Sequence, residues 1–255
     1  MKKTLIIKTV NEMIQWRSHI KNQTVGFVPT MGALHTGHTS LLQQCHLEND
    51  LTILSIFVNP TQFNNPEDLQ NYPQTFDHDY HLACESGVDV LFYPQFSEIY
   101  PDQYRFKVIE NEFSRLLCGA HRPGHFDGVL SVVMKLFHIT RAHKSYFGMK
   151  DYQQYNLIKS MANAFFLETQ VIGLPTIREE SGLAKSSRNM RLSDEGKIKA
   201  ALIYKTISSI KDINQAKVTL QQSGFEVEYL EDIDNRRYIA AYLEGIRLID
   251  NVEIS

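Results

Sequence analysis

Residues 28–38 read Val28-Pro29-Thr30-Met31-Gly32-Ala33-Leu34-His35-Thr36-Gly37-His38 and join an apolar run to a helical pattern. The apolar run, Thr24–Pro29, predicts a strand, and His38–Glu48 predicts a helix. Backbone N–H groups at the start of such a helix favour anions, phosphate in particular. His35 and His38 frame one glycine, so both imidazoles can reach the same ligand and donate to phosphate oxygens during displacement at phosphorus. The stretch therefore predicts a phosphate-binding turn.

Two other interpretations of this stretch remain open at the level of the motif alone. Short motifs such as H-x-G-H occur by chance in unrelated proteins. In that case the stretch is an ordinary strand–turn–helix with two exposed histidines. The preceding strand and the following helix weaken that interpretation. A zinc site is weaker still, because no third ligand stands at a metal-like spacing nearby. We therefore predict no metal ligands among the protein side chains.

Short apolar runs alternate with helical patterns through the first two-thirds of the chain. Further strands are predicted at Thr4–Thr9, Leu51–Val58, Asp89–Tyr93 and Thr169–Gly173. Helices are predicted at Asn11–Lys21, at Thr75–Ser86, at about Tyr152–Ala164, and around the periodic pattern from Val129 to Thr140. Strands alternating with helices predict an α/β fold with a Rossmann-like parallel sheet. Such sheets bind ligands at the carboxyl ends of their strands.

The pattern changes after Gly173, where a polar segment precedes a helix start at Ser193. The remainder predicts two helices and then strands near Phe225–Leu230, Tyr238–Leu243 and Arg247–Ile249. We place a domain boundary near residue 175. The prediction is a Rossmann-like domain over residues 1–175 and a small α+β domain over residues 176–255.

Composition narrows the class of protein. The chain has 255 residues, 26 basic and 29 acidic side chains and a net charge of −3, which argues against a general nucleic-acid binder. The longest apolar stretch, Leu51–Val58, is far shorter than the roughly 18 residues of a membrane helix. The three cysteines match neither a disulfide framework nor a zinc site, and no small-residue cleavage site follows the N-terminal apolar run. We therefore expect a cytoplasmic protein that has neither a nucleic-acid partner nor a membrane partner.

The longer string from Pro29 to His38 resembles the pantothenate synthetase (pantoate–β-alanine ligase) family of the H-x-G-H nucleotidyltransferase superfamily. Five further blocks resemble that family in the same order, over nearly the whole chain. They are Ser55-Ile56-Phe57-Val58-Asn59-Pro60-Thr61-Gln62-Phe63, Arg122-Pro123-Gly124-His125-Phe126, Phe147-Gly148-Met149-Lys150-Asp151-Tyr152-Gln153-Gln154, Ser186-Ser187-Arg188-Asn189 and Arg247-Leu248-Ile249-Asp250-Asn251.

The resemblance implies a two-step reaction. The carboxylate of (R)-pantoate attacks the α-phosphorus of ATP to give pantoyl adenylate and pyrophosphate, and the amine of β-alanine then displaces AMP. The resemblance also implies Mg²⁺ accompanying ATP, a C-terminal domain that acts as a lid, and a homodimer.

The resemblance also implies a set of site residues. Those implied for ATP binding are Met31, Gly32, Ala33, Leu34, His35, Thr36, Gly37, His38, Gly148, Met149, Lys150, Asp151, Ile177, Lys185, Ser186, Ser187 and Arg188. His38, His35, Lys150 and Arg188 are the implied catalytic residues. Those implied for pantoate and β-alanine are Pro29, Thr30, Met31, Gln62 and Gln154. Without these blocks, either glutamine would be interpreted as a surface amide and Asp151 as a helix cap.

Four features depart from the family pattern. Lys185 stands where a hydrophobic residue is expected, Met149 replaces an acidic residue, and Asp127 replaces a basic one. The C-terminal domain is also shorter than expected. Because that domain is expected to act mainly as a lid, its shortness predicts an altered ATP affinity rather than lost chemistry.

Three alternative functions are weighed against this one. A nucleotidyltransferase acting on a phosphate acceptor would share the histidine motif but not the block around Gln62. A non-catalytic ATP-binding module would be favoured by loss of His38, Lys150 or Arg188, and all three are present. A tRNA-binding synthetase fragment would need a basic face, which the sequence lacks. Asp77 and Asp79 are interpreted as acids at a helix start, with an outer-sphere contribution to Mg²⁺ as the alternative, and neither is predicted to be a metal ligand.

Overall fold

The computed structural model describes residues 3–254 and divides them into two compact units. Unit 1 comprises residues 3–148 and 153–174, and unit 2 comprises residues 149–152 and 175–254. Residues 1, 2 and 255 of the predicted domains lie outside the described part of the chain. The assignment of Met149–Tyr152 to unit 2 was not predicted, because it depends on contacts with a strand about a hundred residues later.

Unit 1 is built on a six-stranded sheet in which every described pair of neighbouring strands is parallel. The strands are β1 (Leu5–Ile7), β2 (Val25–Thr30), β3 (Leu51–Ile56), β4 (Val90–Phe92), β5 (Lys144–Gly148) and β6 (Gln170–Leu174), in the order β1-β4-β3-β2-β5-β6. The predicted α/β fold class and five of the six strands are confirmed.

Strand β5 was missed by the sequence analysis although it pairs with β2 and β6 in the sheet. It begins with Lys144 and ends with Gly148, so only a short apolar run is visible in the sequence. Ser145 is nevertheless fully buried between its neighbours. Its burial comes from the flanking strands, which the local pattern does not show.

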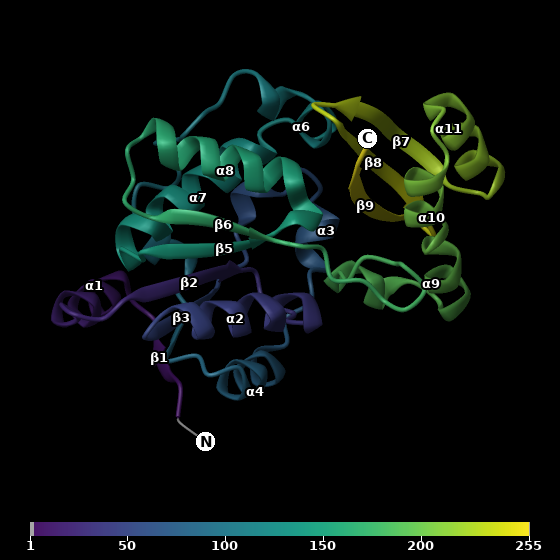
Figure 1. Ribbon diagram of the computed structural model, residues 1–255. Coiled ribbons are helices and arrows are strands. Elements are labelled where there is room, and N and C mark those ends of the chain that lie inside the picture. The colour runs from purple at the N-terminus through teal and green to yellow at the C-terminus, as the bar shows by residue number, and fades with distance from the viewer. Residues whose placement is uncertain (1–2, 255) are drawn as a thin grey trace. The chain divides into compact units, whose positions relative to one another are not determined.

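Helices cover both faces of this sheet (Figure 1). The helices are α1 (Val10–His19), α2 (Thr36–Glu48), α3 (Pro66–Gln70), α4 (Phe76–Glu85), α5 (Phe96–Ile99), α6 (Cys118–His121), α7 (His125–Thr140) and α8 (Tyr152–Ala164). Short 3-10 helices are η1 (Pro60–Gln62) and η2 (Phe113–Arg115). Helices α2 and α4 lie on one face, and α1, α7 and α8 lie on the other.

Unit 2 contains an antiparallel sheet of β7 (Glu226–Ile233), β8 (Arg236–Leu243) and β9 (Ile246–Glu253). Two-residue turns join these strands, with positive φ at Asp234, Asn235, Glu244 and Gly245, as hairpin turns require. The helices are α9 (Asp194–Ala200), α10 (Leu202–Ser209) and α11 (Ile213–Gln222), and the 3-10 helices are η3 (Met149–Asp151) and η4 (Ser187–Arg191).

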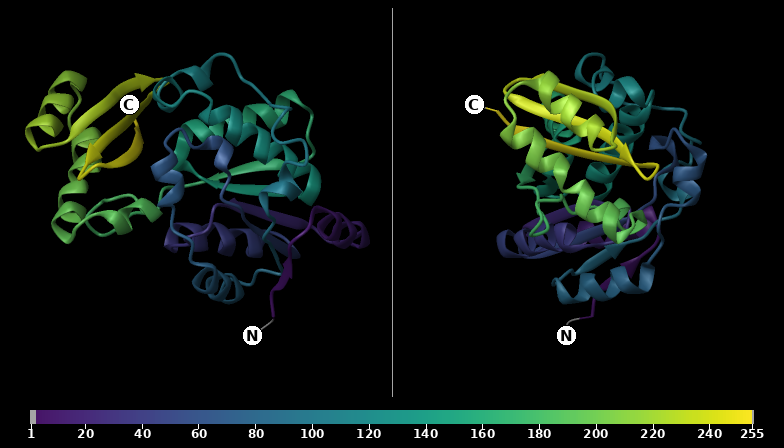
Figure 2. Two further views of the ribbon diagram at one scale, coloured as in Figure 1. Left: turned by 180° about the vertical axis from the view of Figure 1, so that it is seen from behind. Right: turned by 90° about the vertical axis from the view of Figure 1, so that its right-hand side faces the viewer.

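Figure 2 shows the helices of unit 2 lying along its antiparallel sheet. The helices and strands share a core, in which Ile203, Ile207 and Leu220 pack with Ile239 and Leu248. Two helices were predicted before the strands and three are present, because α9 and α10 are separated only at Ala201, which keeps helical dihedral angles. Within residues 3–254, no helix has the length and apolar character needed to cross a bilayer.

Candidate functional site

In unit 1, the loops after β2 and β3 bring together two of the predicted substrate residues. Met31 follows β2 directly, and Gln62 ends the short helix η1 after β3. Because the strands are parallel, both loops leave the sheet at the same edge. The Gln62 Nε2 amide donates to Met31 Sδ at 3.3 Å. Residues about thirty positions apart thus meet at the carboxyl ends of adjacent strands.

The turn after β2 is held by the side chain of Asp79, from the first turn of α4. The backbone N–H groups of Ala33 and Leu34 donate to its two carboxylate oxygens at 2.9 and 2.8 Å. Gly32 has φ +84°, and a Cβ there would lie 3.0 Å from that carboxylate. Ala33 also has positive φ, at +50°. The carboxylate therefore stabilises a backbone conformation that is unfavourable for an ordinary residue.

This role of Asp79 was not predicted. The residue is an acid in the first turn of a helix, as the sequence indicated, but its side chain is only 1 % exposed and also accepts from Thr75 Oγ1. The interpretation of Asp79 as an acid at a helix start is confirmed, and the structure adds a second role, in which its side chain holds the turn after β2. Nothing in the local pattern distinguishes it from Asp77, which is exposed on the same helix.

His35 and His38 lie at the start of α2 with their ring centroids 4.1 Å apart. His35 is the residue that caps the helix, and its Nδ1 accepts from Gly37 N at 3.1 Å. His38 Nδ1 accepts from His35 N at 3.3 Å. A ring nitrogen that accepts carries no proton, so each neutral imidazole has its proton on Nε2. The pair thus offers two Nε2–H donors beside a thirteen-residue helix whose N-terminus favours anions.

The other predicted residues around this turn hold the end of β2 in place or form the start of α2. Thr30 Oγ1 donates to Ser55 O at 2.8 Å and accepts from Gly32 N at 3.2 Å, so it ties the end of β2 to β3. Pro29 pairs in register with Ser55. Thr36 and Gly37 form the first turn of α2.

The side chain of Gln62 is oriented by Asn59, which was part of a family block but was not predicted as a site residue. Asn59 is 1 % exposed, and its Nδ2 donates to Gln62 Oε1 at 3.0 Å. Tyr100 and Thr61 donate to Asn59 Oδ1 at 3.1 and 2.9 Å, which fixes the orientation of that amide. Burial raises the pKa of Tyr100 to about 12, so its hydroxyl stays a neutral donor. Gln62 Nε2 is therefore the donor that faces Met31.

The backbone of Gln62 is held by the start of α7. His125 Nδ1 donates to Gln62 O at 2.7 Å, and Arg122 donates to the same oxygen at 3.3 Å. A Cβ at Gly128 would lie 2.6 Å from Thr61 O, so only glycine permits this close approach. Asp127, one of the departures from the family pattern, lies in the first turn of α7 and pairs with Arg115 at 3.5 Å.

Gln154 lies half-buried in α8, the helix that follows β5. Its neighbour Gln153 is more buried and has a clear structural role. Gln153 Nε2 donates to Phe113 O and Leu116 O at 2.8 and 2.9 Å, and its Oε1 accepts from Cys118 N at 3.2 Å. Gln153 therefore holds the loop between η2 and α6, whereas Gln154 is the more exposed of the two glutamines.

Gly148 ends β5 in unit 1, and the chain then enters the segment of unit 2 that carries Met149, Lys150 and Asp151. Lys150 Nζ lies 3.4 Å from both carboxylate oxygens of Asp151. Asn251 of β9 donates to the carbonyl oxygens of Met149 and Lys150, each at 2.9 Å. Met149, which lacks the acidic side chain of the family pattern, thus still contributes its backbone to this contact.

The remaining predicted residues lie on a short hairpin of unit 2. Lys185 N donates to Ile177 O at 2.9 Å, and Ser186 caps η4 by accepting from Arg188 N at 3.3 Å. Ser187 is buried and Ile177 is exposed. Lys185 Nζ lies 2.5 Å from the Glu179 carboxylate, so the unexpected cation has an acidic partner on its own hairpin.

These arrangements suit the chemistry of an anionic, phosphate-bearing ligand. Unit 1 carries two imidazole donors at a helix N-terminus and an oriented amide. Unit 2, taken by itself, carries Lys150, the hydroxyls of Ser186 and Ser187, and the Arg188 guanidinium. Among residues 3–254, no group of three His, Cys, Asp or Glu side chains is arranged to hold a metal ion. Both oxygens of Asp79 accept hydrogen bonds from unit 1 itself.

A family model, curated relatives and solved structures all match this chain to one protein family. The model of the pantoate-beta-alanine ligase family matches residues 5–253. A pantothenate synthetase of Bdellovibrio bacteriovorus is 55 % identical over 98 % of this chain and 100 % of its own. The pantoate-beta-alanine ligase of Francisella tularensis, whose crystal structure is described as a complex with beta-gamma ATP and beta-alanine, has a TM-score of 0.94 at 41 % identity, over 98 % of this chain and 97 % of its own. Pantothenate synthetase from Thermus thermophilus has a TM-score of 0.89 at 36 % identity, over 98 % of this chain and 99 % of its own. The chain belongs to the pantoate-beta-alanine ligase family.

Proposed function

We propose that this protein condenses (R)-pantoate with β-alanine at the expense of ATP, releasing pantothenate, AMP and pyrophosphate. Family membership over residues 5–253 supports the overall reaction. The observation in the structure that carries the proposal is the His35–His38 pair, two Nε2–H donors at the N-terminus of α2. A pair of donors at a helix start suits a triphosphate whose α-phosphorus is under attack.

In the first step, a pantoate carboxylate oxygen forms a bond to the α-phosphorus, and the bond between that phosphorus and the pyrophosphate oxygen breaks. The carboxylate is already a nucleophile and needs no base, so we assign His38 as a donor to the phosphate oxygens and His35 as its support. We assign Pro29, Thr30 and Met31 to the position of pantoate and β-alanine. Gln62 Nε2, oriented by Asn59, is assigned to pantoate together with Gln154.

In the second step, the β-alanine nitrogen attacks the acyl carbon of the adenylate and the bond to the AMP oxygen breaks. The ammonium of β-alanine must lose a proton before attack, and the amide nitrogen loses a second one afterwards. We propose that Gln62 also borders the β-alanine position. Exclusion of water protects the mixed anhydride between the two steps.

The ATP residues of unit 2 are proposed by the chemistry of their side chains. Lys150 supplies a positive charge to a phosphate, and Asp151 accepts from a ribose hydroxyl. The hydroxyls of Ser186 and Ser187 and the Arg188 guanidinium bind the phosphates that leave as pyrophosphate. Ile177 O accepts from Lys185 N but keeps a second lone pair, so the Ile177 backbone remains suited to adenine.

Mg²⁺ is proposed to bind with the nucleotide. Mg²⁺ keeps several water ligands and is normally held largely by the phosphates of its substrate. When bound, the ion would neutralise charge on the triphosphate. We further propose that residues 1–175 form the ATP- and pantoate-binding domain, that residues 176–255 serve as a lid, and that the protein is a cytoplasmic homodimer.

Pantoate-dependent exchange of labelled pyrophosphate into ATP, measured without β-alanine, tests this function. Exchange that requires pantoate would establish an acyl adenylate and exclude transfer to a phosphate acceptor. ATP binding without exchange would contradict the proposal and favour a non-catalytic nucleotide-binding module.

A further inference from the structure

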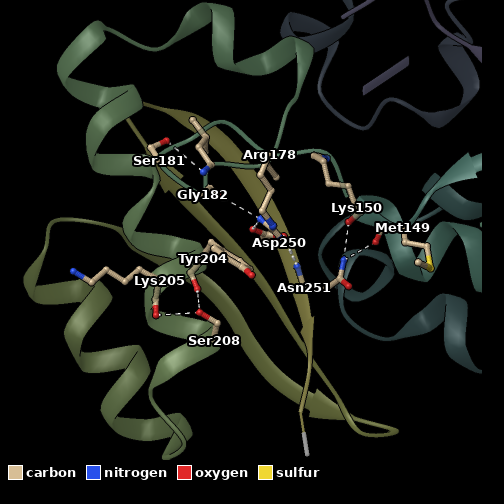
Figure 3. Close-up of polar contacts among 12 residues, drawn as sticks. Met149, Lys150, Arg178, Ser181, Gly182, Tyr204, Lys205, Ser208, Asp250 and Asn251 are labelled. Carbon is tan, nitrogen blue, oxygen red and sulfur yellow. Dashed lines mark hydrogen bonds and ion pairs between the residues drawn. The ribbon is translucent and has the colours of Figure 1, made fainter. Parts of the chain in front are cut away.

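Two consecutive residues of β9, Asp250 and Asn251, contact two different segments of unit 2 (Figure 3). Asn251 Nδ2 donates to Met149 O and Lys150 O, each at 2.9 Å. Asn251 Oδ1 accepts from Arg236 at 2.7 Å, so the guanidinium fixes which end of the amide faces the two carbonyls. Asn251 is only 5 % exposed. A buried amide with both ends occupied holds the Met149–Lys150 backbone in one position.

Asp250 contacts the second segment, at Arg178. Its carboxylate accepts from both terminal nitrogens of Arg178, at 2.6 and 2.9 Å, in the bidentate geometry that arginine favours. Asn251 N donates to the same carboxylate at 2.8 Å. The Arg178 guanidinium also lies 3.7 Å from the centre of the Tyr204 ring and donates to Gly182 O at 3.1 Å. These contacts fix the guanidinium at one face, against Tyr204, and along its edge, through Asp250 and Gly182 O.

Arg178 begins the hairpin that leads to Ser186 and Arg188. It forms an antiparallel bridge with Ala184, and Asn189 Nδ2 donates to Ala184 O at 2.9 Å. Glu179 N donates to Leu183 O at 2.8 Å and closes the hairpin. A shift of Arg178 would therefore displace the chain that enters η4.

We propose that Asp250 and Asn251 are positioning residues that set the Met149–Lys150 backbone and the hairpin before Ser186–Arg188 in a fixed relation to each other. The proposal rests on the proposed function, which assigns both segments to ATP. Neither β9 residue is assigned to a substrate. Their loss should impair use of ATP and leave pantoate binding in place.

The test compares pyrophosphate exchange by the wild type and by Asn251→Asp. This substitution keeps the shape of the side chain and its acceptor toward Arg236, but it turns a carboxylate oxygen toward the carbonyls of Met149 and Lys150. We expect kcat/KM for ATP to fall by roughly 10- to 100-fold, the size of one or two lost hydrogen bonds. The KM for pantoate should stay within about 2-fold, because that substrate is assigned to residues of unit 1.

A double-substitution cycle tests whether Asn251 acts through Lys150. If it does, Asn251→Asp should lower kcat/KM for ATP much less in a Lys150→Met background than in the wild type. Independent effects that multiply would overturn the proposal. Arg247→Met is the matched control, because it removes the half-buried Arg247–Glu228 ion pair from the same strand. It should lower the melting temperature without changing the KM for ATP.

Asp250→Asn is a second, milder variant should Asn251→Asp fail to fold. It removes the charge that faces Arg178 and keeps one acceptor, and we expect a several-fold higher KM for ATP with an unchanged KM for pantoate. Wild-type kinetics in a folded Asn251→Asp or Asp250→Asn protein, or equal losses for both substrates, would overturn the positioning role alone. No pantoate-dependent exchange by the wild type would overturn the proposed function and this inference with it.

Discussion

The carboxylate of Asp79 holds the backbone of Leu34, a residue 45 positions earlier in the chain, through a hydrogen bond of 2.8 Å from Leu34 N. The same side chain accepts from Ala33 N at 2.9 Å. These bonds link the first turn of α4 to the turn that precedes the two histidines. The shape of the candidate phosphate-binding turn therefore depends on a residue outside its own strand–turn–helix segment.

We expect Asp79→Asn to destabilise the protein and impair the use of ATP. The substitution places an amide N–H₂ against a backbone N–H and removes a charge from a buried hydrogen-bond network. The free energy of unfolding should fall by about 2–4 kcal/mol, and kcat/KM for ATP should fall by roughly 10- to 100-fold. Urea unfolding and pyrophosphate exchange measure the two effects.

Asp77→Asn is the matched control for this variant, because Asp77 is exposed on the same helix. It should change the free energy of unfolding by less than about 0.5 kcal/mol. Equal effects of the two substitutions would contradict the role given to Asp79.

His38→Ala should lower the rate of pantoate-dependent pyrophosphate exchange by about 10²–10³-fold, the usual effect of losing one transition-state donor. His78→Ala, which changes an exposed histidine of α4, should leave the rate unchanged. Single-turnover measurement at saturating ATP separates the chemical step from binding. A wild-type rate in His38→Ala would remove this imidazole from the mechanism.

Gln62→Ala should weaken pantoate more than ATP. The lost amide is proposed to donate to a carboxylate, so the KM for pantoate should rise by roughly 10- to 100-fold while the KM for ATP stays within about 2-fold. Steady-state kinetics with each substrate varied in turn provide the measurement. Gln70→Ala, an exposed glutamine of α3, serves as the control. Parallel increases in both KM values would contradict the assignment of Gln62.

Lys185→Met tests the cation that departs from the family pattern. Its ion pair with Glu179 is partly exposed, so the free energy of unfolding should change by less than about 1 kcal/mol. The KM for ATP should rise by roughly 2- to 5-fold if the lysine adds a weak phosphate contact, as we expect. Lys197→Met, at the exposed pair with Asp194, is the control. A KM for ATP equal to or below the wild-type value would show that Lys185 does not assist binding.

Glu48 should make the stability depend on pH in the acidic range. Hydrogen bonds from Lys144, Gln44 and Tyr146 lower the pKa of its carboxyl to about 2, from about 4.3 in an unfolded chain. A lowered native pKa contributes stability that is fully present above the unfolded pKa and is lost as the pH falls through the native one. The contribution is therefore complete above about pH 5 and declines toward pH 2.

The measurement is the melting temperature of wild type and Glu48→Gln between pH 7 and pH 3. We expect the wild type to be more stable at pH 7 and the difference to shrink as the pH falls. Glu67→Gln, an exposed carboxyl on α3, should give a difference that is small at every pH. A difference that grows in acid would contradict the lowered pKa of Glu48.

Glu48 also shows why β5 escaped the sequence analysis. The carboxylate at the end of α2 accepts from Lys144 Nζ at 2.8 Å and from Tyr146 OH at 2.9 Å, both on β5. These polar partners make the strand look unlike its apolar neighbours. The other strands were predictable because Val25–Thr30 and Leu51–Ile56 are apolar runs bounded by polar residues, which a strand buried on both faces requires.

The sequence alone determined the α/β architecture, the strand–turn–helix around His35 and His38, and the family. Each of these follows from residues that are close together in the chain: apolar runs, the start of a helix, and short family motifs that occur in a fixed order. The tertiary structure alone decided which residues hold the candidate site segments in shape. Asp79 accepts from the backbone of the distant Ala33–Leu34 turn, and Asn251 donates to the distant carbonyl of Met149. Asn59 lies only three residues from Gln62, but its amide is oriented by Tyr100, which comes from a distant part of the chain. Because a buried polar group must find its partner in space, its role follows from the folded chain and not from its neighbours in the sequence.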